Sequence, residues 1–356
     1  GDDLELDAAR TSLSGHAEQV KFGKYGGGIV RFETSFVRQS AGFDVNDLGF
    51  LRRADQQDWS TWASVRFNTP RGIYRWLQIN GNHWQTWNTS GTRLQSAFNT
   101  NAHMGLENNW NVHAGATFDG FGEAYCDRCT RGGPLLRRSR GIFPWFGVNG
   151  DNRRTIVPSM WVNLGFNDEG RTKTMHLNPG VTVRISTRLQ ANVGAGISHN
   201  DNATQWFGNF DDNGVTHYSF AHLDQRTLSM NLRVNYTAGP DLTFELYAEP
   251  FVSTGTYSDV RELSATPDAG RYDARFVAYT PPASADLGFS FSQLRTNAVA
   301  RWEYKPGSTL FLVWAHGRQD FEAAPSDRAW SDGYRDLLEL HPANTFLVKV
   351  AYWFNR

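Results

Sequence analysis

Residues 228–236 of this chain alternate apolar and polar side chains without exception. The apolar members are Leu228, Met230, Leu232, Val234 and Tyr236. A β-strand points successive side chains to opposite faces, so one face of this strand suits hydrocarbon or a protein core and the other suits water. The same pattern recurs along nearly the whole chain, in segments of about ten residues separated by turn residues, which is typical of a transmembrane β-barrel.

The composition restricts the classes of protein to which the chain can belong. Charged residues make up 20% of the sequence and the net charge is -1, so there is no electrostatic case for binding nucleic acid. Aromatic residues reach 14%, which suits β-strands and the aromatic girdles of membrane barrels. No run of about 18 apolar residues occurs, which excludes a transmembrane helix.

The turns predict the number of strands. Seven tight breaks fall at residues 26–28, 70–72, 107–109, 150–152, 186–188, 238–240 and 305–307, each rich in residues that favour turns. They alternate with connections at 40–58, 88–92, 120–140, 167–171, 199–216, 254–290 and 319–343, most of which are longer. Short periplasmic turns and longer extracellular loops alternate in this way in outer-membrane barrels.

Seven tight turns join fourteen strands, and two further strands are expected at the ends of the chain. Residues 4–8 alternate correctly for the first strand, and residues 345–354 for the last. The prediction is therefore an all-β, antiparallel transmembrane barrel of about 16 strands with both termini in the periplasm. The alternative is a soluble all-β propeller or sandwich, whose strands alternate too but whose turns have similar lengths at both ends.

Charged side chains inside the alternating segments indicate which face points inward. An Arg or Lys on the lipid face near the membrane midplane costs about 2–4 kcal/mol. We therefore expect nine charged residues to face the lumen: Arg31, Glu33, Arg184, Arg233, Glu245, Glu249, Arg295, Arg301 and Glu303. Their mixed signs fit either ladders of ion pairs that narrow the pore or a channel filled with water.

The sequence contains few groups with recognisable chemistry. Cys126 and Cys129 predict a loop disulfide, with an incidental free pair or a metal or redox site as alternatives. Loop carboxylates that offer calcium ligands are Asp44, Asp47, Asp211 and Asp212, although neither run completes an EF-hand and solvated loops are the default. The sequence predicts no cofactor and no catalytic motif.

Several longer segments resemble one bacterial family. They are residues 40–55, 130–134, 247–253, 301–311 and 344–354, in that order along the chain. They resemble the domain of unknown function 5916, an outer-membrane-like β-barrel region that usually follows a carbohydrate-binding-like domain of the family-9 type. The resemblance implies that residues 1–356 form a single barrel domain without the upstream family segments. It implies no established activity, and the two cysteines are not part of the family pattern.

The functional expectation follows from the polar inner face. The leading hypothesis is an outer-membrane barrel that conducts or takes up small polar solutes, with saccharides as candidates because of the family's usual partner domain. The second is a structural anchor with a filled lumen for a carbohydrate-binding partner domain. The third is an enzyme at the outer rim, for which Asp127, Glu262 and Asp273 are loop candidates that form no recognisable constellation. The expected partners are outer-membrane lipid, lipopolysaccharide and a carbohydrate ligand.

Overall fold

The chain folds around one large antiparallel sheet. The structure is a computed structural model that describes residues 7, 9–323 and 330–354. Fifteen strands follow one another in space in their sequence order, and a sixteenth, β15 (Phe276–Ala278), pairs with β14 off this path. The fifteen are β1 (Ala17–Lys24), β2 (Val30–Gln39), β3 (Gln56–Phe67), β4 (Tyr74–Trp87), β5 (Arg93–Leu106), β6 (Asn111–Asp119), β9 (Gly141–Asn149), β10 (Ile156–Asn167), β11 (Thr172–Arg184), β12 (Leu189–Asp212), β13 (Val215–Gly239), β14 (Leu242–Leu263), β16 (Gly288–Lys305), β17 (Ser308–Glu322) and β18 (Ala343–Ala351).

The remaining elements lie in the connections. A separate two-stranded sheet joins β7 (Tyr125–Cys126) to β8 (Leu136–Arg137). The short 3-10 helices are η1 (Asp168–Gly170) and η2 (Tyr272–Arg275), and the α-helix is α1 (Trp330–Glu339). No described helix is both long enough and apolar enough to cross a membrane.

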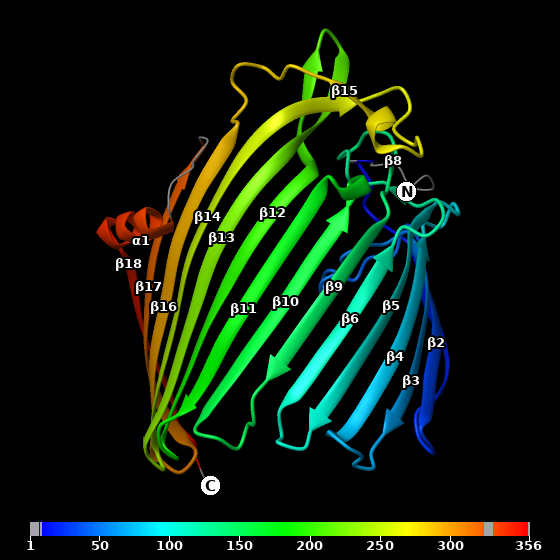
Figure 1. Cartoon of the computed structure of the whole chain (residues 1–356). Coiled ribbons are helices and arrows are strands. Elements are labelled where there is room, and N and C mark those ends of the chain that lie inside the picture. The colour runs from blue at the N-terminus through cyan, green and yellow to red at the C-terminus, as the bar shows by residue number, and fades with distance from the viewer. Residues whose placement is uncertain (1–6, 8, 324–329, 355–356) are drawn as a thin grey trace.

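The sheet has two different ends, which we call the turn end and the loop end. The turn end carries the seven tight connections predicted from the sequence, and the loop end carries the other connections (Figure 1). At the turn end, Gly72 and Gly307 adopt φ angles of 59° and 77°, a left-handed conformation that glycine enters without steric cost. The described chain starts at the loop end and finishes at the turn end (Figure 1).

The predicted count of about sixteen strands is confirmed, but the sixteenth strand is β15. The predicted first strand, residues 4–8, lies outside the described residues apart from Asp7, and Asp7 is not in a strand. β15 is only three residues long because the segment after η2 touches the edge of β14 briefly before turning away.

Two predicted long loops differ from the structure: the loop at 254–290 begins only after Leu263, so Glu262 lies in β14, and the loop at 199–216 is wrong. β12 continues to Asp212 and β13 begins at Val215, so only Asn213 and Gly214 connect them. Their φ angles are 50° and 83°, and two consecutive positive φ angles are what a type I′ hairpin turn requires. The Asn-Gly pair is thus a turn signal within a segment whose polar composition resembled a loop.

The strand register separates the side chains into an apolar face and a polar face. Directly opposed residues of an antiparallel pair share a face. One row across β11, β12, β13 and β14 contains Val181, Val193, Leu232 and Ala248. The row one residue away contains Thr182, Asn192, Arg233 and Tyr247. The alternation read from single segments therefore holds across neighbouring strands of the sheet.

Large apolar side chains remain exposed on the apolar face. Val20, Phe346 and Val348 keep 70%, 76% and 65% of their surface accessible. The buried cluster is small and contains Leu136, Ala203, Phe220, Tyr272 and Phe276. It lies where the connection between β14 and β16 packs on the strands, so it fixes the loop end rather than covering the apolar face.

Within the described residues β1 pairs only with β2, and β18 pairs only with β17. Each strand of the path runs antiparallel to its neighbours, and fifteen is an odd number, so β1 and β18 run in the same direction. The structure therefore shows the predicted all-β antiparallel sheet without showing its closure into a cylinder.

Candidate functional site

The polar face of β3, β4, β5 and β6 carries a chain of amide side chains. Asn80 accepts a hydrogen bond from the Trp62 indole at 3.2 Å and donates one to Asn101 at 2.7 Å. Asn101 donates to Asn99, which in turn donates to Thr117 at 2.9 Å. Because each amide is held by its neighbours, this part of the face has fixed donors and acceptors instead of mobile side chains.

Two tryptophans lie beside this amide chain, on the polar face of β9 and β10. The rings of Trp145 and Trp161 stack with centroids 6.1 Å apart. A Cβ atom added to Gly147 would lie 2.5 Å from the Trp161 ring, and one added to Gly115 would lie 2.7 Å from the Trp145 ring. The two glycines therefore leave the space that lets both rings lie flat across neighbouring strands.

Two histidines complete this group, which we call the His–Trp cluster: His103, His113, Trp145 and Trp161. His113 stacks on Trp161 with centroids 5.2 Å apart and an interplanar angle of 14°. His103 lies 5.9 Å from the Trp145 ring. The register places His103 directly opposite His113, three residues from the tight turn between β5 and β6. The cluster is thus near the turn end.

The register places eight of the nine predicted charged residues on the polar face, and the ninth, Glu303, lies in the irregular end of β16, where it contacts Arg301. Glu33 forms an ion pair with Lys21 at 3.4 Å and accepts a hydrogen bond from Tyr25 at 2.7 Å. Arg301 pairs with Glu303 at 3.1 Å. In both cases the charged residue contacts a partner on the same strand or on the neighbouring strand.

The remaining charged residues are held in different ways. The Arg233 guanidinium lies 5.4 Å from the ring of Tyr247, whose hydroxyl donates to Glu249 at 2.7 Å. Arg295 is the register partner of Glu249. Arg184 donates to backbone carbonyls of the tight turn before β10. Arg31 and Glu245 share the polar face through their register partners on β3 and β13.

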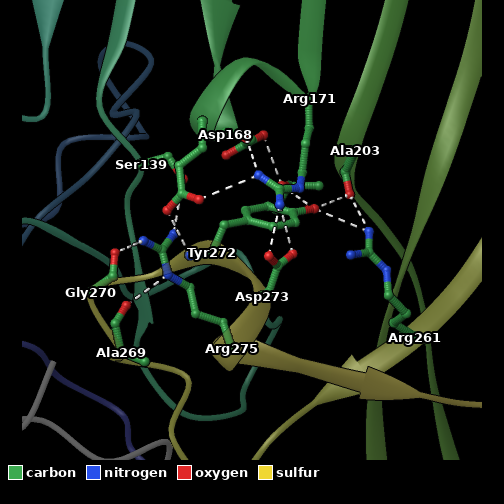
Figure 2. Close-up of polar contacts among 12 residues, drawn as sticks. Ser139, Asp168, Arg171, Ala203, Arg261, Ala269, Gly270, Tyr272, Asp273 and Arg275 are labelled. Atoms are coloured by element: carbon green, nitrogen blue, oxygen red, sulfur yellow. Dashed lines mark hydrogen bonds and ion pairs between the residues drawn. The ribbon is translucent and has the colours of Figure 1, made fainter.

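At the loop end, a buried tyrosine links two connections and the strand β12 (Figure 2). Tyr272 is fully buried, and its hydroxyl donates to the Ala203 carbonyl at 2.7 Å. Arg261 donates to the same carbonyl at 2.8 Å and to the Tyr272 hydroxyl at 3.1 Å. The Tyr272 backbone N–H donates to Glu169 of η1 at 2.8 Å. We call this network the tyrosine clasp, because it fastens the 264–287 connection to η1 and to β12.

Asp168 is linked to the clasp through the hydroxyl of Thr204, which contacts both Asp168 and the Tyr272 hydroxyl. Asp168 is 4% exposed and accepts hydrogen bonds from Thr172 at 2.6 Å and from Thr204 at 2.8 Å. Arg275, also 4% exposed, donates to the carbonyls of Ala269 and Gly270 and to the Ser139 hydroxyl (Figure 2). The 264–287 connection is therefore tied to the 120–140 connection as well.

Cys126 and Cys129 form a disulfide in the pairing expected from the sequence. The disulfide loop contacts two segments that are distant in sequence. Asp127 forms an ion pair with Arg53, and the Arg131 guanidinium lies 3.5 Å from the Trp206 ring centroid. Burial alone would raise the pKa of Asp127, but the hydrogen bond and charge of Arg53 outweigh it and hold this pKa below its ordinary value.

The three rim candidates for catalysis do not form a common site in the described residues. Asp127 pairs with Arg53, Glu262 contacts His217, and Asp273 pairs with Arg171. A polar cavity of about 240 Å³ does lie at the loop end, and both cysteines and Asp168 line it. Its acidic and basic groups already have hydrogen-bond partners, as Arg138 has in Asp119 and Asp168 has in Thr172 and Thr204.

The calcium candidates fall in two separate places. Asp44 accepts hydrogen bonds from the backbone and side chain of Asn46, in the connection between β2 and β3. Asp211 and Asp212 lie in the extended end of β12, where they contact Thr216 and Asn213. Over the described part of the chain, no three residues of the His, Cys, Asp or Glu types come together as a metal site.

Comparison with known proteins decides the family. The family model for the domain of unknown function DUF5916 matches residues 5–355, nearly the whole chain. The chain belongs to the DUF5916 family. No curated protein and no solved structure matches it.

The sequence of this DUF5916 chain does not single out the His–Trp cluster or the tyrosine clasp. Trp145 and Trp161 come together only through the register of β9 with β10, which a single strand pattern does not reveal. Tyr272 contacts a residue 103 positions away, although it lies in a segment for which the sequence predicts only a loop. His103 and His113 are ten residues apart, and nothing in this spacing indicates that their rings touch.

Proposed function

We propose that this DUF5916 chain is an outer-membrane β-barrel whose polar face surrounds a passage for small polar solutes, with saccharides as the favoured class. One observation supports it above the rest: a continuous apolar face with exposed large side chains lies opposite a polar, charged face. Water-soluble monomers rarely expose contiguous apolar patches larger than a few hundred Å². In a membrane the apolar rows contact hydrocarbon, so their exposure has no hydrophobic cost.

The two edge strands, β1 and β18, also favour a closed barrel. An exposed sheet edge of eight or nine residues is a template for aggregation, and a barrel removes it. Since β1 and β18 run in the same direction, closure joins them either by direct parallel pairing or through a further strand that runs opposite to both.

The favoured solute class follows from the polar face. Flat aromatic rings next to fixed amide donors and acceptors suit sugars, whose rings present C–H groups on their faces and hydroxyls at their edges. Trp145 and Trp161 supply the rings, and Asn80, Asn99 and Asn101 supply the amides. Charged residues of both signs lie elsewhere on the polar face. They favour a barrel interior that contains water over one packed with side chains.

Planar-bilayer recording on the purified protein tests this function. We expect discrete conductance steps, and in proteoliposome swelling we expect faster entry of neutral sugars than of anions of equal size. Trp145→Ala with Trp161→Ala should reduce the sugar preference while conductance remains. Protein that inserts fully, shown by protease protection and altered gel mobility without boiling, but never conducts would refute the passage.

The second candidate, an anchor with a closed interior, is favoured by one specific observation. The 120–140 and 264–287 connections are fastened to each other and to the strands at the loop end. Insertion without conductance, in the same experiment, would support the anchor. If the protein is an anchor with a closed interior, deletion of residues 265–270 should leave it non-conducting. If the interior is a passage that only these loops block, the same deletion should produce conductance.

A further inference from the structure

Helix α1 packs on the apolar face of the sheet, toward its loop end (Figure 1). A Cβ atom added to Gly333 would lie 2.8 Å from the side chain of Val252. The register opposes Val252 to Leu228, whose side chain belongs to the apolar face. Tyr334 donates a hydrogen bond to the Leu228 carbonyl at 2.7 Å. The helix therefore helps to bury Val252, which is 1% exposed, on a face where other large apolar side chains stay accessible.

The last turn of α1 is held by an arginine from the same face of the sheet. Arg318 of β17 shares this face with Trp314 and lies opposite Leu294 of β16. Its guanidinium donates to the carbonyl of Leu337 at 3.4 Å and also to the carbonyl of Leu338. A positive charge beside the free carbonyls of a helix C-terminus is favourable. The last turn of α1 has no basic residue of its own, so the sheet supplies this partner.

The helix has an apolar side and a polar side, because its apolar residues recur at helical spacing. The apolar side comprises Trp330, Tyr334, Leu337 and Leu338, and the polar side comprises Asp332, Arg335, Asp336 and Glu339. Leu337 is 1% exposed against the sheet, whereas Leu338, at the edge of the apolar side, keeps 65% of its surface accessible. The helix therefore has more apolar surface than the sheet covers.

The helix lies where the apolar face ends. On β13 the apolar side chains run from Tyr236 to Leu228, and the next residue on that face toward the loop end is Arg226. The register continues from Arg226 to Thr254 and Ser290 on β14 and β16. The apolar segment of β13 spans roughly 26 Å along the strand. A strand tilt of about 40° reduces this to roughly 20 Å, near the apolar band of about 25 Å in outer-membrane barrels. The helix is therefore at the loop-end margin of a band of membrane-spanning height.

We propose that α1 is an interfacial helix that binds the lipid surface at the loop-end margin of the apolar face. Leu338 enters the hydrocarbon boundary, and the side with Asp332 and Glu339 faces water and lipid headgroups. Helices with one apolar and one strongly charged side lie in the membrane interface in this way. Trp330, in the first turn, is of a residue type enriched at that depth. The inference rests on the proposed membrane barrel, and it adds a lipid contact made by a segment outside the barrel wall.

Nitroxide labels on the full chain, reconstituted into phosphatidylcholine vesicles, test the proposal. Both cysteines of the chain form the disulfide, so an introduced cysteine is the one that reacts with the label. Electron paramagnetic resonance then compares the label's accessibility to oxygen, which concentrates in the bilayer, and to a water-soluble nickel chelate. The label in Leu338→Cys should favour oxygen and lie about 5–10 Å inside the headgroup boundary. The label in Glu339→Cys, on the polar side of the same turn, should favour the nickel chelate.

Val193→Cys separates failure of this inference from failure of the proposed function. Val193 pairs with Leu232 in the middle of the apolar face, so its label should lie deeper in the bilayer than the label in Leu338→Cys. A Val193→Cys label in lipid with a Leu338→Cys label in water would overturn the inference alone. A Leu338→Cys label that neither reagent reaches would indicate a protein contact and would overturn it equally. A Val193→Cys label in water, in protein whose gel mobility without boiling shows that it is folded, would overturn the membrane barrel as well.

Discussion

Arg171 donates two hydrogen bonds, of 2.9 and 2.8 Å, to the carboxylate of Asp273, which lies 102 residues further along the chain. Arg171 directly follows η1, and Asp273 lies in η2. The same guanidinium lies 4.9 Å from the Tyr272 ring centroid. One arginine thus contacts two consecutive residues of η2, and this contact joins the β10–β11 connection to the β14–β16 connection.

A double-mutant cycle should measure the strength of this ion pair. We expect a coupling of about 0.2–1 kcal/mol between Arg171→Ala and Asp273→Ala, because the two side chains are 37% and 57% exposed. Hydrogen exchange of residues 264–275 reports the local opening free energy for each variant. If the effects of the two single substitutions simply add, the contact contributes nothing to holding the connection.

The tyrosine clasp should be more sensitive to substitution than this ion pair. Tyr272→Phe removes the hydroxyl, but Arg261 still donates to the Ala203 carbonyl, so we expect a cost of about 0.5–1.5 kcal/mol. Tyr272→Ala leaves a large cavity in the small buried cluster and should cost about 3–5 kcal/mol.

Amide exchange of residues 264–287, compared with residues 189–200 of β12, would show whether the loss is confined to the loop end. Tyr236→Phe on the apolar face is the matched control, because its ring stacks on Phe244 far from the clasp. Equal loosening of both segments by Tyr272→Phe would mean that the clasp supports the whole sheet.

Much of the sheet could be predicted from the sequence, because its strands obey one local rule. Alternation gives the face of each residue, and the tight turns give the order of the strands, so neighbours in sequence become neighbours in space. The 199–216 segment shows where the rule fails. Its composition is polar on both sides of the turn, and only Asn213-Gly214 indicated that the strands continue.

The site could not be predicted in the same way, because its contacts are set by register and by loops. His103 and His113 meet only if the β5–β6 turn places them opposite one another, and a shift of one residue would separate their rings. Tyr272 meets Ala203 because β14 bends over the loop end, which no local pattern encodes (Figure 1).

Acid should release the disulfide loop from its contact with Arg53. The pKa of Asp127 is below its ordinary value of about 3.9, so its ion pair contributes fully above that pH. The contribution is lost as the pH falls through the lowered pKa of the folded state. Amide exchange of residues 125–131, corrected for its intrinsic pH dependence, should therefore be unchanged from pH 7 to 5 and faster below about pH 3.9.

Asp127→Asn provides the control for this pH dependence. The variant keeps the shape of the side chain but has no charge to titrate, so its loop should exchange faster than the parent's at neutral pH and show no further acid step. An acid step of equal size in the variant would assign the effect to another group, such as Asp55, whose pKa is also lowered.

Adjacent residues of β12 offer the sharpest test of which solvent the apolar face meets. Val193 lies on the apolar face with 48% of its surface exposed, while Asn192 lies on the polar face and accepts a hydrogen bond from Thr182. On a water-exposed surface, Val193→Arg should change stability by less than about 0.5 kcal/mol. Facing lipid near the membrane midplane, it should cost about 2–4 kcal/mol. Asn192→Arg should cost about 0.5–1.5 kcal/mol in either solvent, the value of one lost hydrogen bond. Unfolding of both variants from lipid vesicles would measure the difference, and a smaller loss for Val193→Arg than for Asn192→Arg would mean that the apolar face does not meet hydrocarbon.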